Sequence, residues 1–271
     1  MTADTIDTSV GAVPVLHRLA LGLFARDAVN DRGTNAPLRV GWEASGQLLP
    51  SGHPDWWPCV DFERAGGGRF RLRATPTRPD ALTVRLLDRT RRYVARRLGV
   101  TLWPWADLVD PLPAHFVAVA SRTLPVWLFP GAAYPLPRGA TAIRGRVARQ
   151  TDALPWARID AVDAGGTVLG RAHGDDRGEF LLLLTDTNQN PVQSTVDVRL
   201  VVRAPAVPLP APPVEPVPRP ANPPAAGDLD NPLLRGLTAP AVHVPNTAPT
   251  LQVSVNVGEE LVLADDVPFI P

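Results

Sequence analysis

The chain has 271 residues and a formal net charge of zero, because 27 acidic residues balance 27 basic ones. A nucleic-acid-binding protein ordinarily carries a basic excess that displaces counterions from phosphates, so this neutrality argues against a nucleic-acid partner. Every basic residue is an arginine, and the missing lysine excludes Schiff-base enzymes and P-loop nucleotide-binding proteins, which both need a lysine amine.

Residues 1–13 are predicted to form a disordered leader. The first fifteen residues contain no basic residue and no apolar stretch, so they do not match a secretory signal. No segment approaches the roughly twenty apolar residues that a membrane span requires. Cys59 is the single cysteine, which excludes an intrachain disulfide. The sequence therefore predicts a soluble cytoplasmic protein without a membrane span.

Residues 14–103 are predicted to form an N-terminal β-sandwich. Short runs of alternating apolar and polar residues, typical of strands with one buried face, are separated by turns rich in glycine, asparagine and aspartate. These runs lie at residues 19–24, 38–42, 60–62, 70–73, 82–86 and 100–102. Their spacing favours an antiparallel sandwich, and the 32 prolines and 21 glycines disfavour long helices.

Residues 104–138 form a connector rich in aromatic residues and proline. Residues 116–120 are predicted to be one strand, and residues 124–129 a second strand at a sheet edge, where proline is tolerated. We expect this connector to pack the two domains rigidly together.

Residues 139–204 are predicted to form a second antiparallel β-sandwich. Its expected strands lie at residues 143–147, 155–159, 168–170, 179–184 and 196–200. The fold class is therefore mainly β, with two tandem sandwiches.

Two further segments follow the second sandwich. Residues 205–228 carry a proline at nearly every second or third position, which predicts a semi-rigid, extended linker with little tendency to fold. Residues 229–271 form a C-terminal arm, in which residues 251–257 and 260–263 alternate like a hairpin around Gly258. A lone hairpin is barely stable in water, so it must add to a sheet edge of its own chain or of a partner.

The segment 53–59 holds His53, Cys59 and the pair Trp56 and Trp57. The histidine, Asp55 and the cysteine could form a nucleophilic or metal site, but the intervening prolines would hold these side chains apart on an extended loop. A surface loop is favoured, and the two tryptophans suit stacking on sugar rings or apolar partners. The candidate interaction residues are Trp56, Trp57, Trp127, Phe129, Tyr134, Val253, Val255, Val257 and Phe269.

Three charged clusters have a chemical and a structural interpretation. His173, Asp175 and Asp176 could bind a metal, but a tight turn with aspartate side-chain hydrogen bonds is favoured because their spacing matches no closed ligand set. A cluster of arginines could bind a phosphate or an acidic ligand, but a solvated face is favoured; it consists of Arg89, Arg91, Arg92, Arg96 and Arg97. A cluster of acids near the C-terminal end could help hold calcium, but solubilising charges are favoured; it consists of Glu259, Glu260, Asp265 and Asp266. No catalytic, cofactor or metal residue is predicted.

A family resemblance covers about sixty residues. Its motifs are Gly145-Arg-Val147, Pro155-Trp-Ala-Arg-Ile159, the pair Gly165 and Gly166, and Asp175-Asp-Arg-Gly-Glu-Phe180. Through them, residues 142–203 resemble the carboxypeptidase regulatory-like domain, a transthyretin-like β-sandwich. Gly174 replaces the usual threonine, and Val196 and Val198 stand where the family has a closing Gly-x-Tyr. The resemblance implies an accessory or adhesive module without catalytic residues.

The whole outline also resembles accessory proteins of phage-tail-like contractile injection systems. We therefore expect a non-enzymatic structural or adaptor protein that docks into a larger protein assembly, with homo-oligomers compatible with the sequence. One alternative is a module that binds carbohydrates or small ligands through its tryptophans, and another is a hydrolase, or an accessory domain of one. The sequence leaves open the partner, the stoichiometry and the sheet that receives the C-terminal hairpin.

Overall fold

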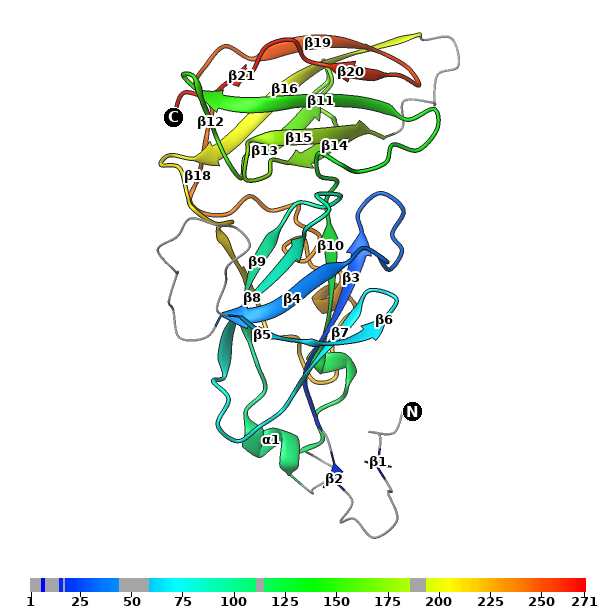
Figure 1. Ribbon diagram of the computed structural model, residues 1–271, viewed down its shortest axis with the longest axis vertical. Coiled ribbons are helices and arrows are strands. Elements are labelled where there is room, and N and C mark those ends of the chain that lie inside the picture. Colours follow the sequence, from blue (N-terminus) through cyan, green and yellow to red (C-terminus); the bar gives the residue numbers. More distant parts are fainter. Residues whose placement is uncertain (1–5, 8–14, 17, 44–58, 111–114, 186–193) are drawn as a thin grey trace.

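A computed structural model describes residues 6–7, 15–16, 18–43, 59–110, 115–185 and 194–271. Strands make up 47% of the chain and helices 6%, which confirms the predicted mainly-β fold. Two β bodies lie one above the other along the long axis, the earlier strands below and the later strands above (Figure 1). None of the helices in the described part of the chain has the length and apolar character needed to cross a bilayer.

The lower body packs a four-stranded sheet against a five-stranded one. The first sheet has the strand order β10 (Thr123–Leu128), β3 (Leu19–Asp27), β7 (Arg69–Arg73) and β6 (Glu63–Gly66). The second has the order β17 (Val214–Val217), β9 (Arg96–Thr101), β8 (Ala81–Asp88), β4 (Leu38–Glu43) and β5 (Cys59–Asp61). Alternation directs one face of each strand inward, as in β7, where Phe70 and Leu72 are buried between exposed arginines.

Two further short strands and two short α-helices lie outside these two sheets. Strands β1 (Ile6–Asp7) and β2 (Val15–Leu16) pair with each other. Helix α1 (Trp105–Val109) lies at the lower end of the molecule, and α2 (Ala226–Leu229) follows β17 (Figure 1).

Two strands of the lower body come from segments that the sequence assigns to the connector and the linker. Strand β10 pairs in parallel with β3, and β17 pairs in parallel with β9. Each is an edge strand, where Pro125 and Pro216 remove no hydrogen bond from a central ladder. The prediction that residues 205–228 have little tendency to fold is wrong for β17, because its alternating side chains bury Glu215 and Val217.

One expectation for the connector also fails. Residues 116–120 do not form a strand; they lead into a short 3-10 helix, Ala120–Arg122, just before β10. The side chain of Asn222 holds this segment, because its amide donates to the Phe116 carbonyl and its Oδ1 accepts from the Ala118 amide.

The upper body is also a two-sheet sandwich. One sheet contains β12 (Asp152–Ala153), β11 (Thr141–Arg149) and β15 (Glu179–Leu184), and β11 also pairs with β20 (Glu260–Val262) and β21 (Val267–Pro268). The other has the order β14 (Val168–His173), β13 (Arg158–Val162) and β16 (Thr195–Pro205), and β16 also pairs with β18 (His243–Pro245) and β19 (Leu251–Asn256).

The C-terminal arm completes this sandwich and is not a hairpin. Strand β19 pairs with β16 in one sheet, whereas β20 and β21 pair in parallel with β11 in the other. Gly258, with a φ of 82°, lies in the turn that carries the chain from one sheet to the other. The arm therefore adds to its own domain, and both bodies contain parallel pairs beside the expected antiparallel ones.

The adjacent residues Phe269 and Ile270 offer a matched test of this arrangement. Phe269 is 1% exposed in the core of the upper body, whereas Ile270 is 54% exposed. Phe269→Ala is expected to lower the free energy of unfolding by about 3–5 kcal/mol, because it leaves a cavity in a packed core. Ile270→Ala is expected to change it by about 0.5 kcal/mol or less.

Urea unfolding followed by circular dichroism measures both changes. Equal, small effects of the two substitutions would contradict the assignment of the C-terminal strands to the core.

Candidate functional site at the junction of the two bodies

The structure places few of the predicted interaction residues where a partner could reach them. Trp56, Trp57 and His53 lie outside the described residues. Cys59 begins β5 and is a half-buried free thiol whose pKa is raised by burial, so it stays protonated and is a poor nucleophile.

The remaining predicted interaction residues are covered by the chain itself. Val253 in β19 and Val257, just after the end of that strand, are both half-buried. The others are buried, so they are not available as interaction residues for a partner, because the two bodies and the C-terminal strands close over them. They are Trp127, Phe129, Tyr134, Val255 and Phe269.

Trp127 is an example of a side chain whose ring contacts and hydrogen bond are both made within the chain. The guanidinium groups of Arg26 and Arg235 lie 5.1 and 4.6 Å from the centroid of its ring, within cation–π range. Its Nε1 donates to Asp31 Oδ1 at 2.5 Å. The ring is therefore an internal stacking partner.

The segment 171–180 forms the favoured turn. Asp175 Oδ1 accepts from the backbone amides of Arg177 and Glu179, and Gly178 has a φ of 73°. His173 is buried, and its Nε2 donates to the Gly236 carbonyl oxygen at 3.0 Å. Among the residues that the structure describes, no group of three or more histidine, cysteine or carboxylate side chains could hold a metal ion.

The arginine-rich segment 89–97 is not a solvated face, because most of its guanidinium groups have carboxylate partners. Arg91 reaches across the junction to Asp175 and Asp176, at 2.5 and 2.7 Å. Arg97 makes two hydrogen bonds of 2.7 Å to Glu43. These pairs neutralise the patch.

Two of the four tail acids have a comparable role. Glu260 pairs with Arg144 at 2.6 Å, and Asp266 pairs with Arg146 at 2.5 Å. These bonds tie β20 and the segment before β21 to the arginines of β11.

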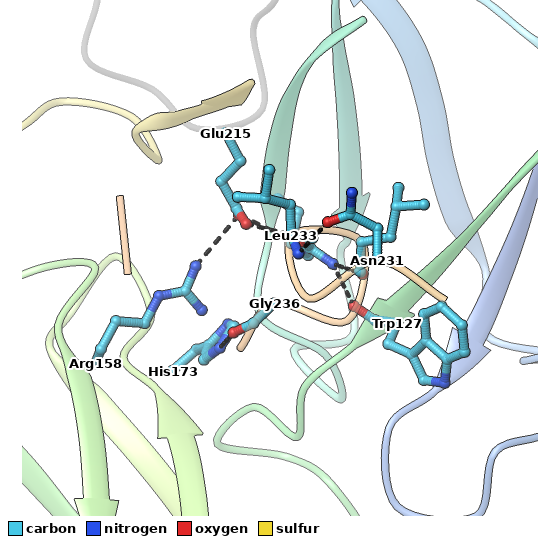
Figure 2. A network of polar contacts seen from close by, with 9 residues as sticks. Trp127, Arg158, His173, Glu215, Asn231, Leu233 and Gly236 are labelled. Atoms are coloured by element: carbon cyan, nitrogen blue, oxygen red, sulfur yellow. Dashed lines mark hydrogen bonds and ion pairs between the residues drawn. The ribbon is translucent and has the colours of Figure 1, made fainter. Parts of the chain in front are cut away.

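Arg96 is a fully buried charge at the junction and is 1% exposed. Three of the residues that bind it, Glu215, Leu233 and Trp127, are labelled in Figure 2. Its Nε and Nη2 bind the two oxygens of Glu215, at 3.2 and 2.7 Å. The other three N–H groups donate to the carbonyl oxygens of Trp127, Leu233 and Leu234 at 2.6–2.8 Å. All five donors of the guanidinium are used, which is the condition for burying a charge without a large penalty.

Glu215 also connects this arginine to the upper body. Arg158, the first residue of β13, donates from Nη2 to Glu215 Oε1 at 3.2 Å. Burial raises the pKa of Glu215, but the two guanidinium groups outweigh this and hold it below its ordinary value. Burial lowers the pKa of Arg158 to about 10, so Arg158 stays charged at neutral pH. One carboxylate of the linker is thus shared by one arginine from each body.

The loop 231–236 closes the junction from the other side. The His173 ring stacks on the Phe129 ring, with centroids 3.7 Å apart and planes 16° from parallel. Gly236 has a φ of 67°, and a Cβ there would lie 2.9 Å from the His173 ring. Glycine is therefore required for the loop to approach the imidazole this closely.

A cleft of about 560 Å³ opens at the junction beside the Arg91 bridge. Tyr93 and Trp156 contribute apolar surface to its wall. Trp156 is fixed there by the hydrogen bond from its Nε1 to the Leu209 carbonyl.

Comparison with protein-family models, with curated proteins and with solved structures found no match to this chain. The resemblance to the carboxypeptidase regulatory-like domain therefore remains a prediction.

Sequence analysis did not identify Glu215 as a junction residue. One available signal was the run of five arginines in residues 89–97, which needs carboxylate partners if any of it is buried. A second was the isolated Glu215 in an alternating Val-Glu-Pro-Val stretch. Neither signal specifies that these segments meet.

Glu215→Gln tests the network, because it removes the charge while keeping the shape of the side chain. Arg96 and Arg158 would remain buried without a counter-charge, and the free energy of unfolding is expected to fall by about 3–5 kcal/mol. Glu260→Gln, which removes a half-exposed partner of Arg144, is expected to cost about 1 kcal/mol or less. Chemical denaturation at pH 7 measures both, and equal small losses would refute the role of Glu215.

His243 gives the junction a pH dependence. Burial beside Arg158 lowers its pKa from 6.5 to about 4, and neither ring nitrogen has a hydrogen-bond partner. The unfolded chain protonates this imidazole below about pH 6.5, whereas the folded chain does so only near pH 4. The contribution of His243 to the free energy of unfolding is therefore fully present above pH 6.5, where the imidazole is neutral in both states, and is lost as the pH falls towards 4.

The expected loss is about 1–2 kcal/mol after allowance for partial exposure. His243→Gln should abolish the part of the loss between pH 6.5 and 4.5. The further loss below pH 4.5, where unfolded carboxylates such as Glu215 become protonated, should remain. Unfolding free energies measured from pH 8 to 3.5 test this, and an unchanged slope in the variant would contradict it.

Proposed function

We propose that this chain is a non-enzymatic structural or adaptor protein that docks into a larger protein assembly. The observation that carries the proposal is the fixed junction. A linker strand joins the sheet of the lower body, and its Glu215 binds one arginine from each body. Such a junction resists bending between the bodies, as a protein that holds other components at a set separation requires.

Exposed apolar side chains support docking at both ends of the long axis. Trp105 lies in α1 at the lower end, and Phe116, 59% exposed, follows that helix. Val262 lies in β20 of the upper body and is 63% exposed, and Ile270 follows β21 (Figure 1). Such side chains gain free energy when a partner covers them, and we take these positions as the docking points.

We place the assembly in the cytoplasm and assign it to the class of phage-tail-like contractile injection particles, on the resemblance of the whole outline. A module that binds small ligands or carbohydrates is the alternative, and the junction cleft is where it would bind. The structural role is favoured because Arg91, which lines this cleft, already binds Asp175 and Asp176.

Photo-cross-linking in the native host tests the proposal. The chain has no lysine for amine-reactive reagents, so benzoylphenylalanine is placed at position 116 or 262, with the exposed linker residue Val207 as the control position. Positions 116 and 262 are expected to cross-link to different proteins in a fast-sedimenting fraction, and position 207 is not. A chain that sediments as a free monomer after gentle lysis and cross-links at neither end would overturn the proposal.

A further inference from the structure

The outer face of the β14–β13–β16 sheet gathers three arginines from three neighbouring strands. Arg158 of β13 lies opposite Arg203 of β16, and Asp160 lies opposite Arg171 of β14. Because residues two apart on a strand share a face, these four side chains belong to the same side of the sheet. They line one hollow of about 210 Å³, together with His173 and residues 236, 237 and 239 of the loop that crosses it.

The charges of this hollow are unbalanced. Three guanidinium groups line it against a single carboxylate, Asp160, which Arg171 already binds at 3.3 Å. Burial raises the pKa of Asp160, so this carboxylate holds its negative charge less readily than an exposed aspartate does. The guanidinium group of Arg203, an exposed residue of β16, makes no hydrogen bond or ion pair with any described residue. Arg158 also shares Glu215 with Arg96, so the connected network of four arginines and two carboxylates carries an excess of two positive charges.

Arg158 and Arg203 occupy an unfavourable arrangement for a sheet. Like charges at directly opposed positions of antiparallel strands destabilise the pair. In addition, Nη1 of Arg158 is buried without a hydrogen-bond partner, although Nη2 of the same group binds Glu215. In Figure 2 the guanidinium group of Arg158 lies between Glu215 and the His173 side chain. A buried donor left unpaired costs free energy that an acceptor in the hollow would recover.

We propose that this hollow binds a dianionic phosphate group. Guanidinium groups recognise phosphate through paired, charge-assisted hydrogen bonds, and three of them from three strands can surround a tetrahedral anion. A phosphate monoester carries about 1.5 to 2 negative charges at neutral pH, which matches the excess positive charge. The hollow of about 210 Å³ far exceeds the roughly 10–15 Å³ that a single water needs on the same measure, so it has room for the group and its first hydration waters.

Isothermal titration calorimetry of the full chain tests the site with inorganic phosphate, O-phosphoserine and sulfate. Wild-type protein is expected to bind one phosphate per chain saturably. Arg203→Gln and Arg171→Gln should each weaken binding by about tenfold or more, because each removes a charge-assisted hydrogen bond. Arg199→Gln is the matched control, since Arg199 is an exposed arginine of β16 that does not line the hollow.

The ligands distinguish the sources of the phosphate group. Tighter binding of O-phosphoserine than of inorganic phosphate assigns the site to a phosphorylated side chain, and the reverse order assigns it to the free ion. Sulfate binding with the same dependence on Arg203 supports recognition of a tetrahedral dianion. No saturable binding, or equal weakening in all three variants, would overturn the proposal.

Thermal unfolding provides a readout that is independent of the titration. In phosphate-free buffer, Arg203→Gln should be at least as stable as wild type, because it removes repulsion from Arg158. Phosphate should raise the unfolding temperature of wild type more than that of this variant. A variant that is less stable than wild type in phosphate-free buffer, with the same response to phosphate, would show a purely structural role for Arg203 and refute the site.

Discussion

The buried carboxylate of Glu215 is the constraint on which the junction of this protein depends. A carboxylate removed from water is strongly destabilising unless charged partners replace its hydration. Arg96 and Arg158 supply those partners from the two bodies, and backbone carbonyls of β10 and the loop 231–236 occupy the remaining donors of Arg96. Because each group has one satisfactory position, the charges determine how the two bodies, the linker and this loop fit together.

The two bodies do not follow the order of the chain. The lower sandwich takes β10 and β17 from segments on either side of β11, and the upper sandwich takes β19, β20 and β21 from the C-terminal end. Each late strand covers a sheet edge or a core that earlier strands leave open. Neither body is completed by one continuous stretch of sequence, and this interleaving joins the bodies more firmly than a simple tether would.

Arg158 links the two proposals. Its Nη2 belongs to the network that fixes the junction. Its Nη1 is buried without a hydrogen-bond partner, and Arg158 also lines the hollow of Arg171 and Arg203. A phosphate group bound there would share a guanidinium with Glu215. The anion site and the mechanical junction are therefore neighbours in one charge network, although the adaptor role does not require the anion.

The sequence by itself determined the fold class and most strands, because alternation of side chains along a strand is a local property. It also determined the Asp175 turn, whose hydrogen bonds span only a few residues. Only the tertiary structure decided that the linker supplies β17, that the apparent hairpin divides between two sheets, and that Arg96 is buried with Glu215. These pairings join residues far apart along the chain, here 119 positions for Arg96 and Glu215. The local pattern of side chains shows that a segment forms a strand or carries a charge that needs a partner. Which distant strand or charge pairs with it is decided by the packing of the whole molecule.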